Sequence, residues 1–124
     1  MAYSTTLNYV VGDMLPALDL TLRDKNTAAS GATLDSENSA TWAPINITGA
    51  TVRLRLRELG STTIVDTRTF SITNPTGGAC TTNFSASTFP KAGTYEGEIE
   101  ITFSDNSIQT VYDLVKFKVR DDFD

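Results

Sequence analysis

Carboxylates are the most numerous groups in this sequence that could do chemistry, but their spacing predicts no active site. The chain has 15 Asp and Glu residues among 124 and no histidine. Asp105 and Asp113 bracket one turn near the end, yet nothing places two carboxylates across a cleft, as glycoside hydrolysis requires. Without histidine, the commonest general base and the commonest metal ligand are missing. We therefore expect no enzyme activity and no catalytic residue.

Groups with metal or redox chemistry are also sparse. The single cysteine, Cys80, cannot form an internal disulfide or a cysteine-based zinc site, and we expect it to be a small buried side chain. Asp105 and Asn106 offer the oxygen ligands that calcium prefers, but the same residues form a typical turn sequence. We predict no cofactor and no metal site, and calcium binding at this turn stays open.

Length and charge narrow the range of partners. A chain of 124 residues with a net charge of -5 and a pI near 4.6 is expected to form one domain over residues 1–124. An acidic chain is poorly suited to nucleic acid or to an anionic membrane surface. The start, MAYSTTLNYVVGD, has no basic region of a secretory signal, and no apolar run reaches the ~20 residues of a membrane span. We expect no nucleic-acid partner and no membrane.

Two rows of like charge are the strongest binding candidates. Arginines alternate with apolar residues in TVRLRLR, and glutamates do so in TYEGEIEITF. Successive side chains of a strand point to opposite faces, so each row is expected on an outer face. Each row could contact a partner or could simply be solvated, and the two strands could also be neighbours that form an internal ladder. The candidate contact residues are Arg53, Arg55, Arg57, Glu96, Glu98, Glu100 and Trp42.

Trp42 is the only tryptophan. It lies near the end of residues 24–44, a Ser/Thr/Ala-rich stretch without periodicity that we predict to be a long loop or insertion. Tryptophan is over-represented among the residues that contribute most binding energy at interfaces. Trp42 could therefore anchor an interface, or it could fold back to cap the end of the domain.

The elements that must position these residues are strands. Period-two alternation dominates, and no stretch keeps a helical period. The last strand changes phase, which predicts a bulge near Asp113. The pattern favours an all-β antiparallel sandwich of about seven strands, expected over residues 5–11, 17–23, 51–57, 62–72, 79–84, 94–103 and 108–119.

Three blocks of the sequence have a distinctive composition and order: Tyr9–Asp24 (YVVGDMLPALDLTLRD), Ile45–Glu58 (INITGATVRLRLRE) and Ala92–Val111 (AGTYEGEIEITFSDNSIQTV). Together, in this chain order, they resemble the immunoglobulin-like amino-terminal domain of phage upper-baseplate proteins. The chain departs from the family in its long 24–44 connection. The family's upper-baseplate proteins continue into a helical or fibrous segment that carries a receptor-binding tip, and we expect no receptor binding by these 124 residues. The resemblance implies an immunoglobulin-like sandwich that serves as an attachment module of a virion.

The resemblance also implies a function. It indicates a non-enzymatic structural protein of a tailed-phage virion, assembled in the host cytoplasm, that serves as an attachment or assembly module of the baseplate, tail or neck. Its partners would be other virion structural proteins and copies of itself in a trimer or ring. The alternatives are a capsid decoration protein and a carbohydrate- or host-surface-binding module, for which Trp42 and Tyr112 are the candidate aromatics.

Overall fold

The chain folds almost entirely into strands. The computed structural model describes residues 3–14, 16–111 and 114–123, which contain eleven strands, one short 3-10 helix and no α-helix. The prediction of an all-β fold is confirmed. The elements are β1 (Tyr3–Val10), β2 (Leu18–Thr21), β3 (Arg23–Ala28), η1 (Ser39–Thr41), β4 (Trp42–Pro44), β5 (Thr51–Glu58), β6 (Ile64–Thr69), β7 (Ser71–Asn74), β8 (Ala79–Thr82), β9 (Gly93–Thr102), β10 (Ile108–Thr110) and β11 (Leu114–Arg120).

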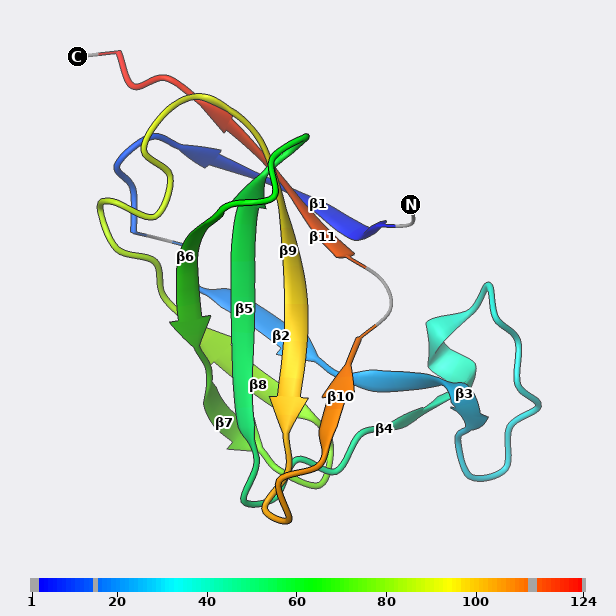
Figure 1. The fold of residues 1–124 in the computed structure, drawn as a ribbon. Coiled ribbons are helices and arrows are strands. Elements are labelled where there is room, and N and C mark those ends of the chain that lie inside the picture. Colours follow the sequence, from blue (N-terminus) through cyan, green and yellow to red (C-terminus); the bar gives the residue numbers. More distant parts are fainter. Residues whose placement is uncertain (1–2, 15, 112–113, 124) are drawn as a thin grey trace.

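Two sheets form a sandwich. The large sheet has the order β1-β11-β9-β5-β6, with β10 paired to β9, and the small sheet has the order β2-β8-β7. Figure 1 shows the small sheet lying behind the large one. Hydrophobic side chains from both sheets meet between them, and the buried positions on β5 are the alternating Val52, Leu54 and Leu56. The alternation seen in the sequence therefore sorts side chains between the core and the outer face.

The strands are more numerous than the seven or so expected, because the expected strands 62–72 and 108–119 are each divided into two and because β3 and β4 form within the stretch predicted to be a loop. Phe70 separates β6 in the large sheet from β7 in the small one, and Leu22 separates β2 from β3. Leu22 donates its N–H to Gly78 and accepts a hydrogen bond from the N–H of Ile45, so its backbone joins two different segments. The predicted bulge near Asp113 lies outside the described residues.

One pairing in the sandwich is parallel. β1 runs parallel to β11, from Tyr3 opposite Leu114 to Val10 opposite Arg120, whereas the other pairings are antiparallel. Parallel neighbours need a long connection, and these two strands lie at opposite ends of the sequence. The predicted antiparallel arrangement is therefore confirmed for each strand pair of the described residues except β1 with β11.

An aromatic cluster fills one part of the core. Its rings have neighbouring centroids 5.1 to 5.9 Å apart, within the range of favourable aromatic pairs. Tyr95 also donates its hydroxyl proton to the carbonyl of Lys91 at 2.7 Å. The cluster consists of Tyr9, Phe84, Phe89, Tyr95 and Phe117.

Residues 23–44 form a small two-stranded arm rather than a plain loop. β3 and β4 pair antiparallel, with Arg23 opposite Pro44 and Ala28 opposite Trp42, and Figure 1 shows this arm projecting from the sandwich. The prediction of a loop over residues 24–44 is therefore corrected at its ends. The sequence RDKNTA of β3 hides the strand because its side chains are half-buried or exposed on both faces, so no apolar alternation develops.

Candidate protein-interaction site

The two charged rows lie side by side on one face. β5 and β9 pair antiparallel in a register that sets the three arginines directly opposite the three glutamates: Arg53 opposite Glu100, Arg55 opposite Glu98, and Arg57 opposite Glu96. Directly opposite residues share a face of the sheet, and the intervening residues of both strands point into the core. Of the arrangements left open by the sequence, the structure has the internal ladder.

The ladder is tightest at one end. The Nε of Arg57 lies 2.7 Å from Oε1 of Glu96, and Glu96 is buried with 5% exposure. On the other side of Glu96, β11 places Lys116 directly opposite it. A carboxylate with so little contact with water needs such partners, because an unpaired buried charge is strongly destabilising. The Arg57–Glu96 pair is therefore part of the structural framework of this face.

The ladder is looser at its middle. The guanidinium of Arg55 lies 3.7 Å from Glu100, and the Arg55 side chain is 46% exposed. An exposed pair at this distance contributes only about 0–1 kcal/mol to stability. Arg55 and the exposed Glu98 opposite it are therefore accessible to a partner at little cost to the fold.

A third row of charges was missed in the sequence. On β11 the residues Val115, Phe117 and Val119 are buried, so Lys116, Lys118 and Arg120 share the outer face with the ladder. The alternation of these three residues with apolar residues was the available signal. The change of phase before β11 left open whether they share a face with the glutamates of β9. We call the nine outer residues of β5, β9 and β11 the charged face: Arg53, Arg55, Arg57, Glu96, Glu98, Glu100, Lys116, Lys118 and Arg120.

The charged face contains a small hollow. Its volume is about 90 Å³, and its lining combines arginine and glutamate side chains with the apolar residues Ile64 and Leu114. Ile64 is 46% exposed at the start of β6. The hollow has room for one aliphatic side chain surrounded by charges.

Trp42 belongs to the arm. Its Nε1 donates to the carbonyl of Asp35 at 2.9 Å, and the Nζ of Lys25 lies 5.6 Å from the centroid of its ring. Trp42 also lines a groove of about 310 Å³ together with Leu20, Leu22, Ile99 and other residues at the side of the sandwich. Trp42 thus contacts Asp35 in the segment between β3 and β4, lies near Lys25 of β3, and faces the groove at the side of the sandwich.

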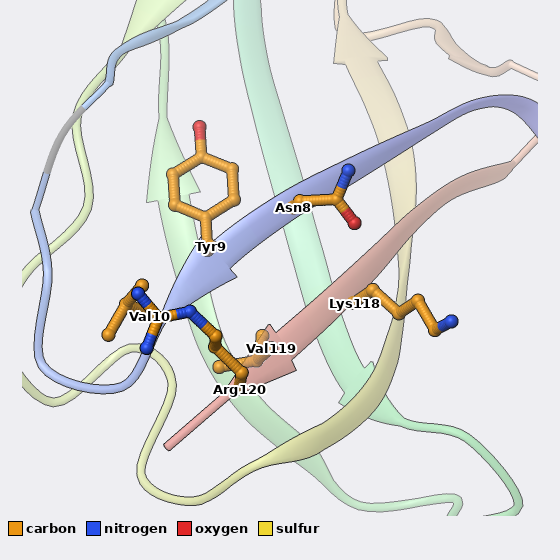
Figure 2. Close-up of a pocket in the computed structure, with 6 residues that line it drawn as sticks. All are labelled: Asn8, Tyr9, Val10, Lys118, Val119 and Arg120. Atoms are coloured by element: carbon orange, nitrogen blue, oxygen red, sulfur yellow. The ribbon is translucent and has the colours of Figure 1, made fainter. Parts of the chain in front are cut away.

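A wider depression follows β1 and β11. It measures about 530 Å³ and is lined by Asn8, Tyr9, Val10, Lys118, Val119 and Arg120 (Figure 2). Tyr9 and Lys118 extend away from their strands in different directions (Figure 2). The hydroxyl of Tyr9 donates to the carbonyl of Pro16 at 2.8 Å, and burial raises the pKa of this phenol. The six residues that line the depression include no carboxylate and no nucleophile paired with a base.

Of the side chains with possible ligand chemistry, Asp105 accepts hydrogen bonds within its own turn and Cys80 is buried. Oδ1 of Asp105 accepts hydrogen bonds from the backbone N–H and the hydroxyl of Ser107 at 3.0 and 2.6 Å, and these bonds lower the pKa of Asp105. Cys80 is buried, as expected, and burial raises its pKa to about 11. Across the described residues, no group of three or more His, Cys, Asp or Glu side chains could hold a metal ion.

In that same part of the chain, no helix is long and apolar enough to cross a membrane.

Comparison with known proteins identifies one matching family. The family model of the BppU N-terminal domain matches residues 15–123, which include all strands from β2 to β11. No curated protein matches the chain. Among solved structures, CopC from Methylosinus trichosporium OB3b is similar at a TM-score of 0.47, with 10% sequence identity over 95% of this chain and 88% of that chain.

Proposed function

The chain belongs to the BppU N-terminal domain family, and on that premise we propose that it is an attachment module that assembles a phage baseplate through protein–protein contacts. The observation that carries the proposal is the family match over residues 15–123. The family is a structural domain of the phage baseplate, so the chain is a phage baseplate structural protein. As an attachment module it would make and break no covalent bond.

The charged face and the arm are the surfaces proposed for contact. The Arg57–Glu96 pair holds one end of the ladder in position, so a partner meets an ordered surface there, and little side-chain entropy is lost on binding at that end. The arm, which consists of β3, β4 and the residues between them, projects from the sandwich (Figure 1). A stable contact would need roughly 800 Å² on each partner.

The free edge of β1 is a third proposed contact. β1 ends the order of the large sheet, and its sequence YSTTLNYV contains neither charge nor proline. At the opposite edge, β6 carries Asp66 and Arg68 opposite the buried Leu56 and Leu54, which is a typical way to block edge pairing. The unblocked β1 edge fits an added strand from a neighbouring protein.

The proposal includes the assembly around the domain. The chain would act as one domain over residues 1–124 within the virion, in contact with other virion structural proteins and with copies of itself in a trimer or ring. Symmetry would multiply individually weak contacts through avidity.

Immunogold electron microscopy of intact particles tests the proposal. An antibody against this chain should label the tail tip or neck of the phage that encodes it. Label scattered over the head would indicate a capsid decoration protein instead. Particles without label, in a lysate where the chain itself is detected, would refute a role as an accessible virion component.

A further inference from the structure

The charged face is basic although the chain is acidic. The face holds six of the ten lysines and arginines and three of the 15 acidic residues, so its net charge is +3. The whole chain carries -5, which leaves -8 for the remaining surface. Such an asymmetric charge distribution favours contact between the face and an acidic surface.

The cations of the face are only partly neutralised within the molecule. Glu96 lies between Arg57 and Lys116, and Glu100 is within 3.7 Å of Arg55. Within the part of the chain that the structure describes, no carboxylate is within ion-pair distance of Arg53 or Lys118. Positive charge therefore remains available to a partner on the charged face, at Arg53 and Lys118 and at the half-exposed Arg55 beside the 90 Å³ hollow.

The tip of the arm has the complementary composition. Residues 29–38 contain two charged residues, Asp35 and Glu37, and both are acidic and exposed. Leu34, which precedes them, is 41% exposed. The exposed leucine suits a hollow lined in part by Ile64 and Leu114, and the two carboxylates complement the net positive charge of the whole charged face.

The tip is also held in one conformation before any contact forms. The carbonyl of Asp35 accepts the indole N–H of Trp42, and the N–H of Asp35 donates to Oγ1 of Thr41, both at 2.9 Å. The N–H of Glu37 donates to Oδ1 of Asp35 at 3.0 Å. A tip ordered in this way loses little conformational freedom on docking.

We propose that the arm of one copy docks on the charged face of a second copy, with Leu34 in the hollow and with Asp35 and Glu37 toward Arg55 and the other exposed cations of the face. The arm and the face are different surfaces of the same chain, so the contact is head-to-tail. Each pair leaves one arm and one face free, and successive contacts close into a ring where the rotation permits. The inference deepens the proposed function because it assigns the contact between copies in the trimer or ring proposed there.

Sedimentation velocity of the purified chain tests the contact. We expect self-association at about 20 mM salt that weakens markedly at about 500 mM, because screening lengths fall from roughly 20 Å to a few ångströms. The arm variant Leu34→Ser/Glu37→Lys and the face variant Arg55→Glu/Lys118→Glu should each sediment as monomers. A control, Asp13→Lys/Ile108→Ser, changes an exposed acid and an exposed apolar residue elsewhere and should associate like the wild type.

Mixing the two defective variants makes the test specific. The face variant keeps an intact arm and the arm variant keeps an intact face, so an equimolar mixture should form a dimer and stop there. This outcome also proves that both variants are folded. A wild-type chain that remains monomeric at low salt, or a mixture that remains monomeric although both variants unfold cooperatively, would overturn the inference. Gold at the baseplate together with a monomeric chain would reject this contact and leave the attachment function standing.

Discussion

Arg57 on β5 and Glu96 on β9 are 39 positions apart in the sequence, and Nε of Arg57 lies 2.7 Å from Oε1 of Glu96 on the outer face of the large sheet. The Glu96 side chain is 5% exposed and the Arg57 side chain is 35% exposed, so the carboxylate is buried and the guanidinium is partly accessible to water. A row of charges that looks solvated in the sequence is thus anchored at one end by a buried ion pair.

Loss of Arg57 should destabilise the fold more than loss of its neighbour in the same row. Arg57→Ala removes the guanidinium that lies 2.7 Å from the buried carboxylate of Glu96, which we expect to lower the free energy of unfolding by about 1–3 kcal/mol, since the partial exposure of Arg57 moderates the cost. Arg55→Ala is the matched control and should cost about 0–1 kcal/mol, because its pair is exposed and 3.7 Å long. Urea unfolding measures both. Equal costs would mean that burial of Glu96 is energetically unimportant.

Gly97 should tolerate no larger side chain. It lies among the buried positions of β9, where an added Cβ would come within 2.5 Å of Cδ1 of Leu54 and 3.2 Å of Cε2 of Phe117. Both neighbours are core residues without exposure. We expect Gly97→Ala to lower the free energy of unfolding by about 1–3 kcal/mol.

A second substitution separates this clash from other effects of alanine. In a Leu54→Ala background the atom nearest to the new methyl is absent, so Gly97→Ala should cost markedly less there. The same cost in both backgrounds would assign the effect to the backbone of β9 instead. Thermal or urea unfolding of the four proteins in this double-mutant cycle gives the answer.

The sequence predicts the sandwich well because apolar alternation is a property of each strand. Val52, Leu54 and Leu56 are buried as their spacing requires. Alternation says which face a residue occupies, but not which strand lies next to it. The pairing of β5 with β9, which turns two separate rows into one ladder, depends on long-range packing and could only be left as an alternative.

The features that escaped prediction have weak local patterns. β3 has no apolar face, so the arm looked like a loop, and the parallel partnership of β1 and β11 joins the two ends of the chain. The basic row at Lys116, Lys118 and Arg120 follows a change of phase in the sequence. Only the register of β11 with β9 in the structure shows that this row continues the same face.

The buried thiol of Cys80 should make stability depend on pH in the alkaline range. Burial raises its pKa from 9.0 to about 11 in the folded chain. The folded state therefore keeps its proton at pH values where the unfolded state has lost it. The contribution of Cys80 is fully present below pH 9.0 and is lost as the pH rises through about 11. We expect the free energy of unfolding to decrease less between pH 9.0 and about 11 in Cys80→Ala than in the wild type. Because the thiol is buried, we also expect a thiol reagent at neutral pH to modify the wild type only after unfolding.

Trp42 should control the order of the arm without controlling the fold of the sandwich. Trp42→Phe keeps an aromatic ring at the groove but removes the indole N–H that holds the carbonyl of Asp35 at 2.9 Å. We expect amide exchange to accelerate in the arm, most clearly at Ala29, whose N–H donates to the carbonyl of Thr41. Amides of β5 and β9 serve as the internal control and should exchange as in the wild type.

The same variant connects the order of the arm to its proposed contact. If a preorganised tip is what docks on the charged face, Trp42→Phe should weaken self-association although Leu34, Asp35 and Glu37 are all retained. Hydrogen exchange and sedimentation velocity on the same sample measure the two effects together. Faster exchange in the arm with unchanged association would show that the contact does not require an ordered tip. Unchanged exchange at Ala29 would show that the indole hydrogen bond does not hold the arm.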